Sequence, residues 1–232
     1  MGLPSSRVDR AAAAPAPPAS MPSDAQPPRP THLLYLHGFR SSPASAKARQ
    51  TLQRLQQLQR DGEAPVQWLC PQLPPSPREA IELALRLVRE AAPRRLVLVG
   101  SSLGGFYATW LAERLDCRAA LLNPAVDPAR DLRASIGEMG SWHDPALSFE
   151  FTAEHVQQLH DYELGPLQAP LAHPERYLAV VARDDEVLDA REMLARYAGA
   201  TLRIADSGGH ALEDYAARHC DAVLAFLGVN AD

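Results

Sequence analysis

The sequence predicts an α/β fold, built on a mainly parallel β-sheet that helices cover on both faces. Short apolar runs alternate along the chain with longer segments whose apolar residues repeat at helical spacing. Parallel strands need crossover connections, which are usually helices, and the resulting sheet is buried on both faces. The continuous apolar runs and the alternation of the two kinds of segment therefore predict this fold class.

The individual elements follow from the spacing of apolar residues and from the turn residues between them. Strands are predicted where a short apolar run is bounded by polar or turn residues, in chain order at 32–36, 66–70, 96–100, 119–123, 177–182 and 201–205. Helices are predicted where apolar residues share one side, as Ile81, Leu85 and Val88 do, in chain order at 43–59, 78–91, 103–115, 190–197 and 212–227.

Composition agrees with one globular domain that has a substantial core. The chain has 232 residues, of which 46% are hydrophobic, and a formal net charge of −5. The arginines are scattered among acids and form no dense basic stripe in the sequence, so we expect no nucleic-acid partner. No stretch approaches the roughly 18 apolar residues that a membrane span needs. We expect a soluble cytoplasmic protein, and the sequence leaves its oligomeric state open.

The first thirty residues differ in composition from the rest. Residues 1–30 are rich in Ala and Pro and have no periodic apolar face, and their prolines block helix and sheet hydrogen bonds. We therefore expect a disordered tail, followed by one domain over residues 31–232. A signal peptide is the alternative because Arg7 and Arg10 precede an Ala-rich stretch, although prolines interrupt that stretch and it lacks large apolar residues.

The three cysteines, Cys70, Cys117 and Cys220, lie far apart in the sequence, and at least one must be unpaired. They fit a reducing compartment and buried apolar positions better than a disulfide framework or a metal site. A cysteine nucleophile is the alternative, but none of the three lies in a turn motif like that of the serine described below.

One segment breaks the alternation of strands and helices. Residues 124–174 contain no convincing strand and carry aromatic residues, among them Trp142 and Phe149. The segment follows one predicted strand and precedes the next, which places it above the carboxyl edge of the sheet, where ligands of open α/β sheets bind. We interpret it as a small cap, with Trp142 and Phe149 as walls of a substrate pocket. Packing of these aromatic rings into the ordinary core is the alternative.

The same segment carries four histidines, His143, His155, His160 and His173. Their spacing is not the i, i+4 pair of a zinc-binding helix. We therefore expect no metal ion, and the chemistry predicted below needs no organic cofactor.

The most informative motif is Gly100-Ser101-Ser102-Leu103-Gly104, at the end of the predicted strand 96–100. Glycines on both sides permit a sharp turn from strand to helix that holds the central Ser102 in a strained conformation. The N–H groups at the start of the following helix have no intrahelical acceptor and can bind a developing oxyanion. The motif predicts Ser102 as a nucleophile, and a Gly/Ser-rich turn without chemistry is the alternative.

A serine nucleophile needs a base because its hydroxyl is a poor nucleophile at neutral pH. The loop after strand 201–205 offers His210, behind Gly208 and Gly209. The loop after strand 177–182 offers four carboxylates, those of Asp184, Asp185, Glu186 and Asp189. The order serine, acid, histidine, with the acid and the histidine on loops at the ends of later strands, predicts a catalytic triad. These residues alone leave the acid open, and His219 in the last predicted helix is the weaker candidate for the base.

The loop after the first strand supplies the other half of an oxyanion site. His37-Gly38-Phe39 follows strand 32–36 directly, and a His-Gly loop at this place commonly contributes one oxyanion N–H, with the second from the residue after the nucleophile. These donors would be the N–H groups of Phe39 and Leu103. We expect the His37 ring to support this loop at the edge of the substrate site, and a second base is the alternative.

Five strings occur in an order that identifies a family. They are Tyr35-Leu36-His37-Gly38-Phe39, Pro71-Gln72-Leu73-Pro74, Gly100-Ser101-Ser102-Leu103-Gly104-Gly105, Leu122-Asn123-Pro124-Ala125-Val126 and Asp185-Glu186-Val187-Leu188-Asp189. Together they resemble the YqiA-type esterases, a compact bacterial branch of the α/β hydrolases, over about residues 33–228. The resemblance implies an α/β-hydrolase fold and hydrolysis of carboxylic esters, with activity on acyl thioesters such as acyl-CoA.

The resemblance also assigns the triad. It places Ser102 and His210 on the family's motif positions and selects Asp185 as the acid. Two positions depart from the family pattern. The family usually has Gly where this chain has Asp184, which leaves Asp184 as a second choice for the acid. It also tends to have a Gly-Gly-Asn-His turn where this chain has Ser207-Gly208-Gly209-His210.

We therefore expect a serine hydrolase that acts on a small-molecule acyl ester or thioester through an acyl-enzyme intermediate. Two alternatives stay open. An acyltransferase would use the same triad with an acceptor other than water. A catalytically silent binding protein would keep the fold without the activity.

Overall fold

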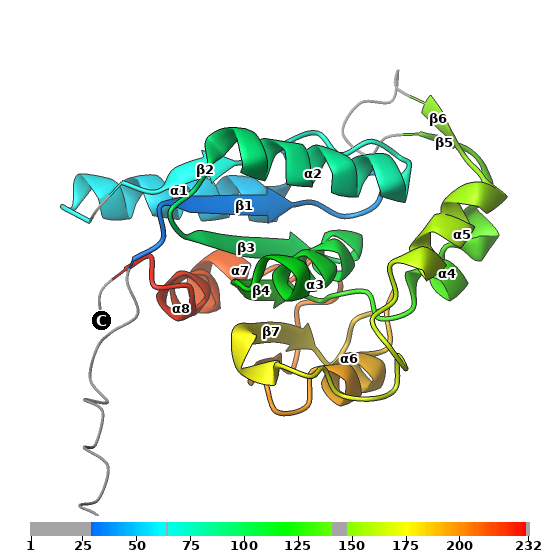
Figure 1. Ribbon diagram of the computed structural model, residues 1–232. Helices are drawn as coiled ribbons and strands as arrows, with labels where there is room; N and C mark the ends of the chain where they lie inside the picture. Colours follow the sequence, from blue (N-terminus) through cyan, green and yellow to red (C-terminus); the bar gives the residue numbers. More distant parts are fainter. Residues whose placement is uncertain (1–28, 64, 141–147, 231–232) are drawn as a thin grey trace, which may run out of the picture.

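A six-stranded parallel sheet forms the centre of the computed structural model, which describes residues 29–63, 65–140 and 148–230 (Figure 1). The strand order across the sheet is β2-β1-β3-β4-β7-β8. The strands are β1 His32–Leu36, β2 Gln67–Leu69, β3 Leu96–Ser101, β4 Arg118–Leu122, β7 Tyr177–Ala182 and β8 Thr201–Ala205. All neighbouring strands of this sheet pair in parallel, which confirms the predicted fold class. The expected tail over residues 1–30 lies almost wholly outside the described residues.

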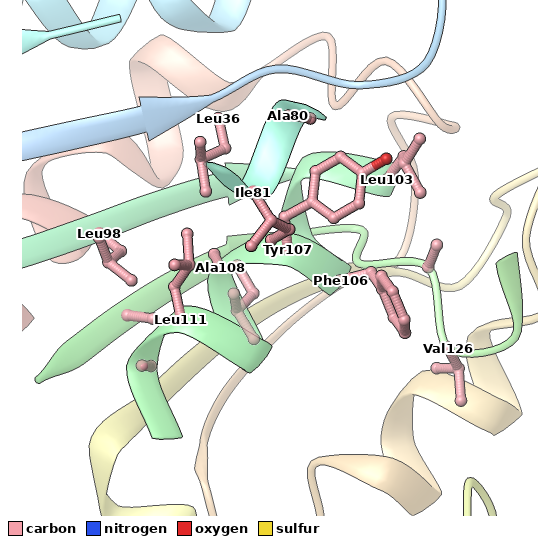
Figure 2. Close-up of a cluster of buried hydrophobic side chains, with 14 of the residues drawn as sticks. Leu36, Ala80, Ile81, Leu98, Leu103, Phe106, Tyr107, Ala108, Leu111 and Val126 are labelled. Atoms are coloured by element: carbon pink, nitrogen blue, oxygen red, sulfur yellow. The ribbon is translucent and has the colours of Figure 1, made fainter. Parts of the chain in front are cut away.

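Helices cover both faces of the sheet because side chains alternate between the faces along each strand. Leu36 and Leu98 face α2, α3 and α6, whereas Leu33 and Val97 face α1, α7 and α8. Figure 2 shows the first of these layers, where Ile81 of α2 and Leu111 of α3 lie near Leu36 and Leu98. The helices are α1 Ala46–Arg60, α2 Pro77–Ala91, α3 Leu103–Leu115, α6 Ala190–Arg196, α7 Tyr215–Arg218 and α8 Cys220–Phe226.

The predicted last helix, over residues 212–227, is divided into α7 and α8. Leu212 has a φ of 49°, and His219, between the two helices, has a φ of −122° that ends α7. The apolar periodicity continues across this break because both helices direct apolar residues, such as Tyr215 and Leu224, into the same buried cluster. Periodicity alone therefore could not reveal the interruption.

The segment over residues 124–174 contains two strands, so the expectation that it has none was wrong. β5 Gly137–Gly140 and β6 Ser148–Phe151 form an antiparallel pair beside the short helices α4 Pro128–Asp131 and α5 Ala153–Asp161. β5 reads Gly-Glu-Met-Gly, without the apolar run or alternation by which strands are recognised in a sequence. Figure 1 shows this hairpin and both helices beyond the arrowheads of β1 and β3, at the carboxyl edge of the sheet. Single 3₁₀ turns lie at Arg133–Ser135 and Pro174–Arg176.

The strand order reverses at β1. The chain goes from β1 to β2 on one side, then returns to place β3 on the other side of β1. In open α/β sheets, ligands bind in the crevice beyond the carboxyl ends of the two strands at such a reversal. His37 follows β1 and Ser102 follows β3 directly, so both residues lie at this point. Among the helices of the described residues, none is long and apolar enough to cross a membrane.

Candidate active site

Ser102 occupies the sharp turn between β3 and α3. Its φ is 56° and its ψ is −122°, a strained conformation for a residue with a side chain. The Ser102 carbonyl accepts the N–H of Gly105 at 2.8 Å and of Ala125 at 3.1 Å, and the Ser102 N–H donates to Leu122 O at 3.0 Å. These hydrogen bonds hold the serine at the tip of the turn.

Glycine is required where α3 crosses the strands below it. A Cβ atom on Gly104 would clash with the carbonyl oxygen of Leu36, and one on Gly100 would clash with the carbonyl oxygen of Gly104. Backbone atoms on both sides cannot move away without breaking the sheet. The two glycines thus allow α3 to approach β1 and β3 closely enough to hold Ser102 at the sheet edge.

Three side chains from three separate loops form a continuous chain of hydrogen bonds. His210 Nε2 lies 3.1 Å from Ser102 Oγ, and His210 Nδ1 lies 2.9 Å from Asp185 Oδ2 and 3.1 Å from Oδ1. The Asp185 side chain is fully buried, whereas that of His210 is 22% exposed. With the proton on Nδ1 facing the carboxylate, Nε2 is free to accept the proton of the serine hydroxyl.

The environment of Asp185 keeps it ionised. Burial alone would raise its pKa, but hydrogen bonds from His210 and from the N–H groups of Leu188 and Val187 outweigh burial and lower it. An ionised carboxylate at this position holds the His210 ring in one tautomer and stabilises the imidazolium that forms when the ring takes a proton.

The neighbouring acids hold the backbone of the histidine loop. Asp184 accepts the N–H groups of Gly208 at 3.2 Å and Gly209 at 3.0 Å, and Glu186 accepts the N–H of His210 at 2.9 Å. Asp189 caps α6 instead, by accepting the N–H of Arg191. The structure therefore brings one of the four carboxylates, that of Asp185, to the His210 ring, and the other three bind backbone N–H groups.

Two residues that sequence reasoning missed hold the carbonyl side of the same loop. Asn123, buried at the end of β4, donates from Nδ2 to Gly209 O at 3.0 Å and to His210 O at 3.3 Å. Lys47 donates from Nζ to His210 O at 3.1 Å and to Ala211 O at 2.9 Å. A polar residue ending an apolar strand was a signal for Asn123. Lys47 had no signal, because a lysine in an amphipathic helix resembles any solvated residue.

The Lys47→Met variant should differ from the parent in how its stability depends on pH. Burial, partly offset by the charges of Asp185 and Glu186, lowers the pKa of Lys47 to about 8, whereas an unfolded lysine titrates near about 10.4. Between these values the unfolded parent binds more protons than the folded parent, so its free energy of unfolding rises with pH. The non-titrating variant lacks this contribution.

Urea denaturation at pH 7.5 and pH 10 measures this effect. We expect the parent to gain on the order of 1 kcal/mol relative to Lys47→Met between the two pH values. Because all other titrating groups are shared, the difference isolates Lys47. Parallel pH curves for the two proteins would contradict the lowered pKa of Lys47.

The loop after β1 lies against the serine. A Cβ on Gly38 would lie 3.2 Å from Ser102 Cβ. The buried His37 ring accepts the N–H of Leu73 at Nε2, at 3.0 Å, so its proton is on Nδ1 and donates to Gly38 O, also at 3.0 Å. In a trans peptide the C=O and the next N–H point in opposite directions. The hydrogen bond from His37 Nδ1 to Gly38 O therefore turns the N–H of Phe39 away from the His37 ring.

A cavity of about 630 Å³ opens beside this loop. Gly38, Phe39 and Leu103 line it, of which Gly38 lies against Ser102 and Leu103 follows Ser102 in the chain, and His37 and Phe149 line it as well. Further walls are the apolar Leu73, Pro74, Pro75 and Tyr107 and the polar Arg40, Ser41, Gln72 and Ser148. Of the two aromatic residues predicted as pocket walls, Phe149 lines this cavity, and Trp142 lies outside the described residues.

The hairpin is tied to the loop after β1. The Phe39 ring packs edge-on against Phe149, at a centroid distance of 5.9 Å, and against the buried Phe151, at 5.0 Å. Arg40 Nε donates to Gly140 O at 2.6 Å. The pocket wall and the backbone next to Ser102 are thus parts of one packed unit.

The other sequence candidates lie in different surroundings. Burial raises the thiol pKa of Cys70 and of Cys117 to about 12 and that of Cys220 to about 11, so thiolate is scarce at neutral pH. His219 lies between α7 and α8, and its Nε2 is 3.5 Å from Asp214 Oδ1. Within residues 29–63, 65–140 and 148–230, no group of three or more His, Cys, Asp or Glu side chains could hold a metal ion.

Comparison with known proteins places this geometry in a family context. The model of the uncharacterised protein family UPF0227 matches residues 32–228. Among solved structures, a protein from Agrobacterium vitis S4 assigned as a hydrolase matches with a TM-score of 0.63 at 18% identity, over 86% of this chain and 91% of that chain. Est1E from Butyrivibrio proteoclasticus matches with a TM-score of 0.62 at 16% identity, over 87% and 88% of the two chains.

A third structure has the same architecture. The α/β superfamily hydrolase from Oenococcus oeni PSU-1 matches with a TM-score of 0.56 at 17% identity, over 86% of this chain and 92% of that chain. At these identities the likeness establishes the fold, and residue roles have to be argued from the site itself.

Proposed function

Because the chain belongs to the YqiA family of α/β hydrolases, the uncharacterised family UPF0227, we propose that it is a serine hydrolase of carboxylic esters and thioesters. One observation carries this proposal: the hydrogen-bonded chain from Asp185 through His210 to Ser102, at the carboxyl edge of the sheet. The strained backbone of Ser102 supports it, because such strain is retained where function requires it.

In the proposed first step, Ser102 Oγ attacks the carbonyl carbon of the ester while His210 Nε2 takes the hydroxyl proton. The tetrahedral intermediate then breaks its bond to the leaving alcohol or thiol, which receives that proton from His210. This leaves an acyl group on Ser102. Water then attacks the acyl carbon and gives a proton to His210 Nε2, and His210 returns that proton to Ser102 Oγ as the bond to the acyl group breaks and the acid is released. Asp185 stabilises the imidazolium in both steps.

We propose that the N–H groups of Phe39 and Leu103 bind the oxyanion. Leu103 begins α3, so its N–H belongs to the first turn, where no intrahelical acceptor exists. The orientation that His37 gives to the Gly38–Phe39 peptide supports the role of Phe39. Each such donor contributes about 2.7–4 kcal/mol in enzymes where one has been removed.

We propose that the cavity beside the loop holds the acyl group, with the segment over residues 124–174 acting as a cap within a domain that spans residues 31–232. Phe149 of this cap and Tyr107 of α3 give the cavity apolar walls. In the proposed mechanism, the carbonyl oxygen of a bound ester would lie beside Phe39 and Leu103, which line this cavity.

A panel of nitrophenyl esters and acyl-CoAs of graded chain length tests the substrate class. Est1E has been solved with ferulic acid bound, so methyl ferulate belongs in the panel. We expect kcat/KM to rise by about fourfold for each buried methylene and to fall once the chain exceeds the cavity. Phe149→Ala enlarges the pocket and should move the optimum to longer chains, whereas Ser102→Ala serves as the blank.

The panel also separates the alternatives. A protein whose serine reacts with a fluorophosphonate but which hydrolyses no ester or thioester would require an acceptor other than water, as in an acyltransferase. A protein inert in both assays would be a silent binding protein. Either result would contradict the proposed hydrolysis.

A further inference from the structure

Six arginines that are scattered in the sequence gather around one cavity at the amino edge of the sheet. The cavity has a volume of about 1000 Å³ and is lined by Arg29, Arg89, Arg94, Arg95, Arg118 and Arg176 and, among the residues that the structure describes, by one acid, Asp116. The whole chain carries a formal net charge of −5. Such a concentration of positive charge on an acidic protein attracts anions to this edge.

Two of the six arginines are neutralised within the protein. Arg176 forms ion pairs with Asp116 and Glu113, and Arg29 pairs with Glu63. For the other four, Arg89, Arg94, Arg95 and Arg118, no ion pair is formed with any residue that the structure describes. The excess positive charge of the cavity therefore comes from these four side chains.

Contacts with Phe226 hold the Arg118 side chain in place. Its Nη1 donates to Phe226 O at 3.0 Å, and its guanidinium carbon lies 5.3 Å from the centre of the Phe226 ring. Burial and then the charge of Arg118 lower the pKa of the half-buried Arg95. The fold thus keeps two like charges together, an unfavourable arrangement that a bound anion would relieve.

The cavity lies far from the proposed catalytic serine. Arg95 precedes the first residue of β3, and Ser102 follows its last residue. At about 3.3 Å per strand residue, the two ends of β3 are roughly 20 Å apart. A ligand in this cavity is therefore separate from the ester that the triad would hydrolyse.

We propose that this cavity is a second binding site, for a small organic molecule that carries at least two phosphate groups, such as a nucleoside diphosphate. The guanidinium group binds phosphate oxygens with two parallel hydrogen bonds, and four guanidinium groups that form no ion pair with a described residue match a ligand with several negative charges. The apolar side chains of Val88, Pro93 and Leu115 line the same cavity and offer a surface for the organic part. Its volume is at the upper end of the range for small-molecule sites, about 300–1,000 Å³.

Calorimetric titration of the full chain with ADP at low ionic strength tests the proposal, with adenosine and inorganic pyrophosphate as the other ligands. We expect ADP to bind in a 1:1 ratio, pyrophosphate to bind more weakly, and adenosine to give no heat. Added NaCl should weaken ADP binding because salt screens the charges. Ser102→Ala should bind ADP as the parent does, since the two sites are separate.

Charge reversal supplies a matched pair of variants. Arg89→Glu combined with Arg94→Glu changes two exposed cavity residues and should raise the Kd for ADP by at least about tenfold. Arg86→Glu combined with Arg60→Glu makes the same change in net charge at exposed residues outside the cavity and should change the Kd by less than about twofold. Unchanged thermal unfolding shows that both variants are folded.

Several results would overturn the proposal. Absence of ADP binding, equal binding by the two double variants, or equal binding of adenosine and ADP would each do so. Binding of duplex DNA or of phosphatidylserine vesicles through Arg89 and Arg94, without ADP binding, would identify a macromolecular surface in place of a small-molecule site.

Discussion

The Ser102→Ala variant is expected to lose ester hydrolysis by a factor on the order of 10³ or more and to lose all labelling by a fluorophosphonate probe. The reason is that the acyl intermediate forms on Ser102 Oγ, which lies 3.1 Å from His210 Nε2 and gives its proton to that nitrogen. Alanine has nearly the same backbone preferences as serine, and the hydrogen bonds that hold this turn are made by backbone atoms. Thermal unfolding should therefore change little.

Ser101→Ala is the matched control, because Ser101 is the adjacent serine of the same motif but is buried in β3. It should keep both labelling and turnover. Labelling that persists in Ser102→Ala, or that disappears in Ser101→Ala with the fold intact, would contradict the assignment of the nucleophile.

The second large effect is expected from the acid that faces the histidine. Asp185→Asn should lower kcat by a factor on the order of 10⁴, because a neutral amide no longer holds the reactive tautomer of His210 or stabilises its imidazolium. The amide oxygen can still accept the N–H groups of Val187 and Leu188, so the loop should keep its shape. KM should change little, since Asp185 does not line the cavity.

Asp184→Asn is the matched substitution one residue earlier. Its amide oxygen can still accept a hydrogen bond from Gly208 or Gly209, so we expect a loss in kcat of less than about tenfold. Steady-state kinetics on the two variants gives the ranking directly. The reverse ranking would move the acid to Asp184 and leave Ser102 and His210 in place.

The sequence predicted the parts of the structure that depend on local pattern. Strands such as β1 and β7 are continuous apolar runs, and the start and end of α3 were predicted at Leu103 and Leu115, as observed. The turn at Ser102 was recognisable because its glycines are close together in the chain and each is needed for a close backbone approach.

The parts that could not be predicted depend on contacts between distant segments. Lys47 lies more than 160 positions before the carbonyls that it binds, and nothing in its own helix indicates that contact. The strand β5 is stabilised by pairing with β6 and has no apolar signature of its own. The arginines at the amino edge come from separate loops and strand ends, so their common location appears only when the sheet is assembled.

The loop that carries His210 is coupled to Asp184 through hydrogen bonds to its backbone. Asp184 stands where the resemblance to the YqiA-type esterases implies glycine, and it binds the N–H groups of Gly208 and Gly209 in a turn that departs from the pattern which the same resemblance implies. A Cβ on Gly209 would lie 2.8 Å from Glu186 Oε2. The two departures are therefore in contact, and substitutions in contact have non-additive effects. A change at Asp184 and a change at Gly209 are therefore expected to combine non-additively in their effect on the loop that holds His210.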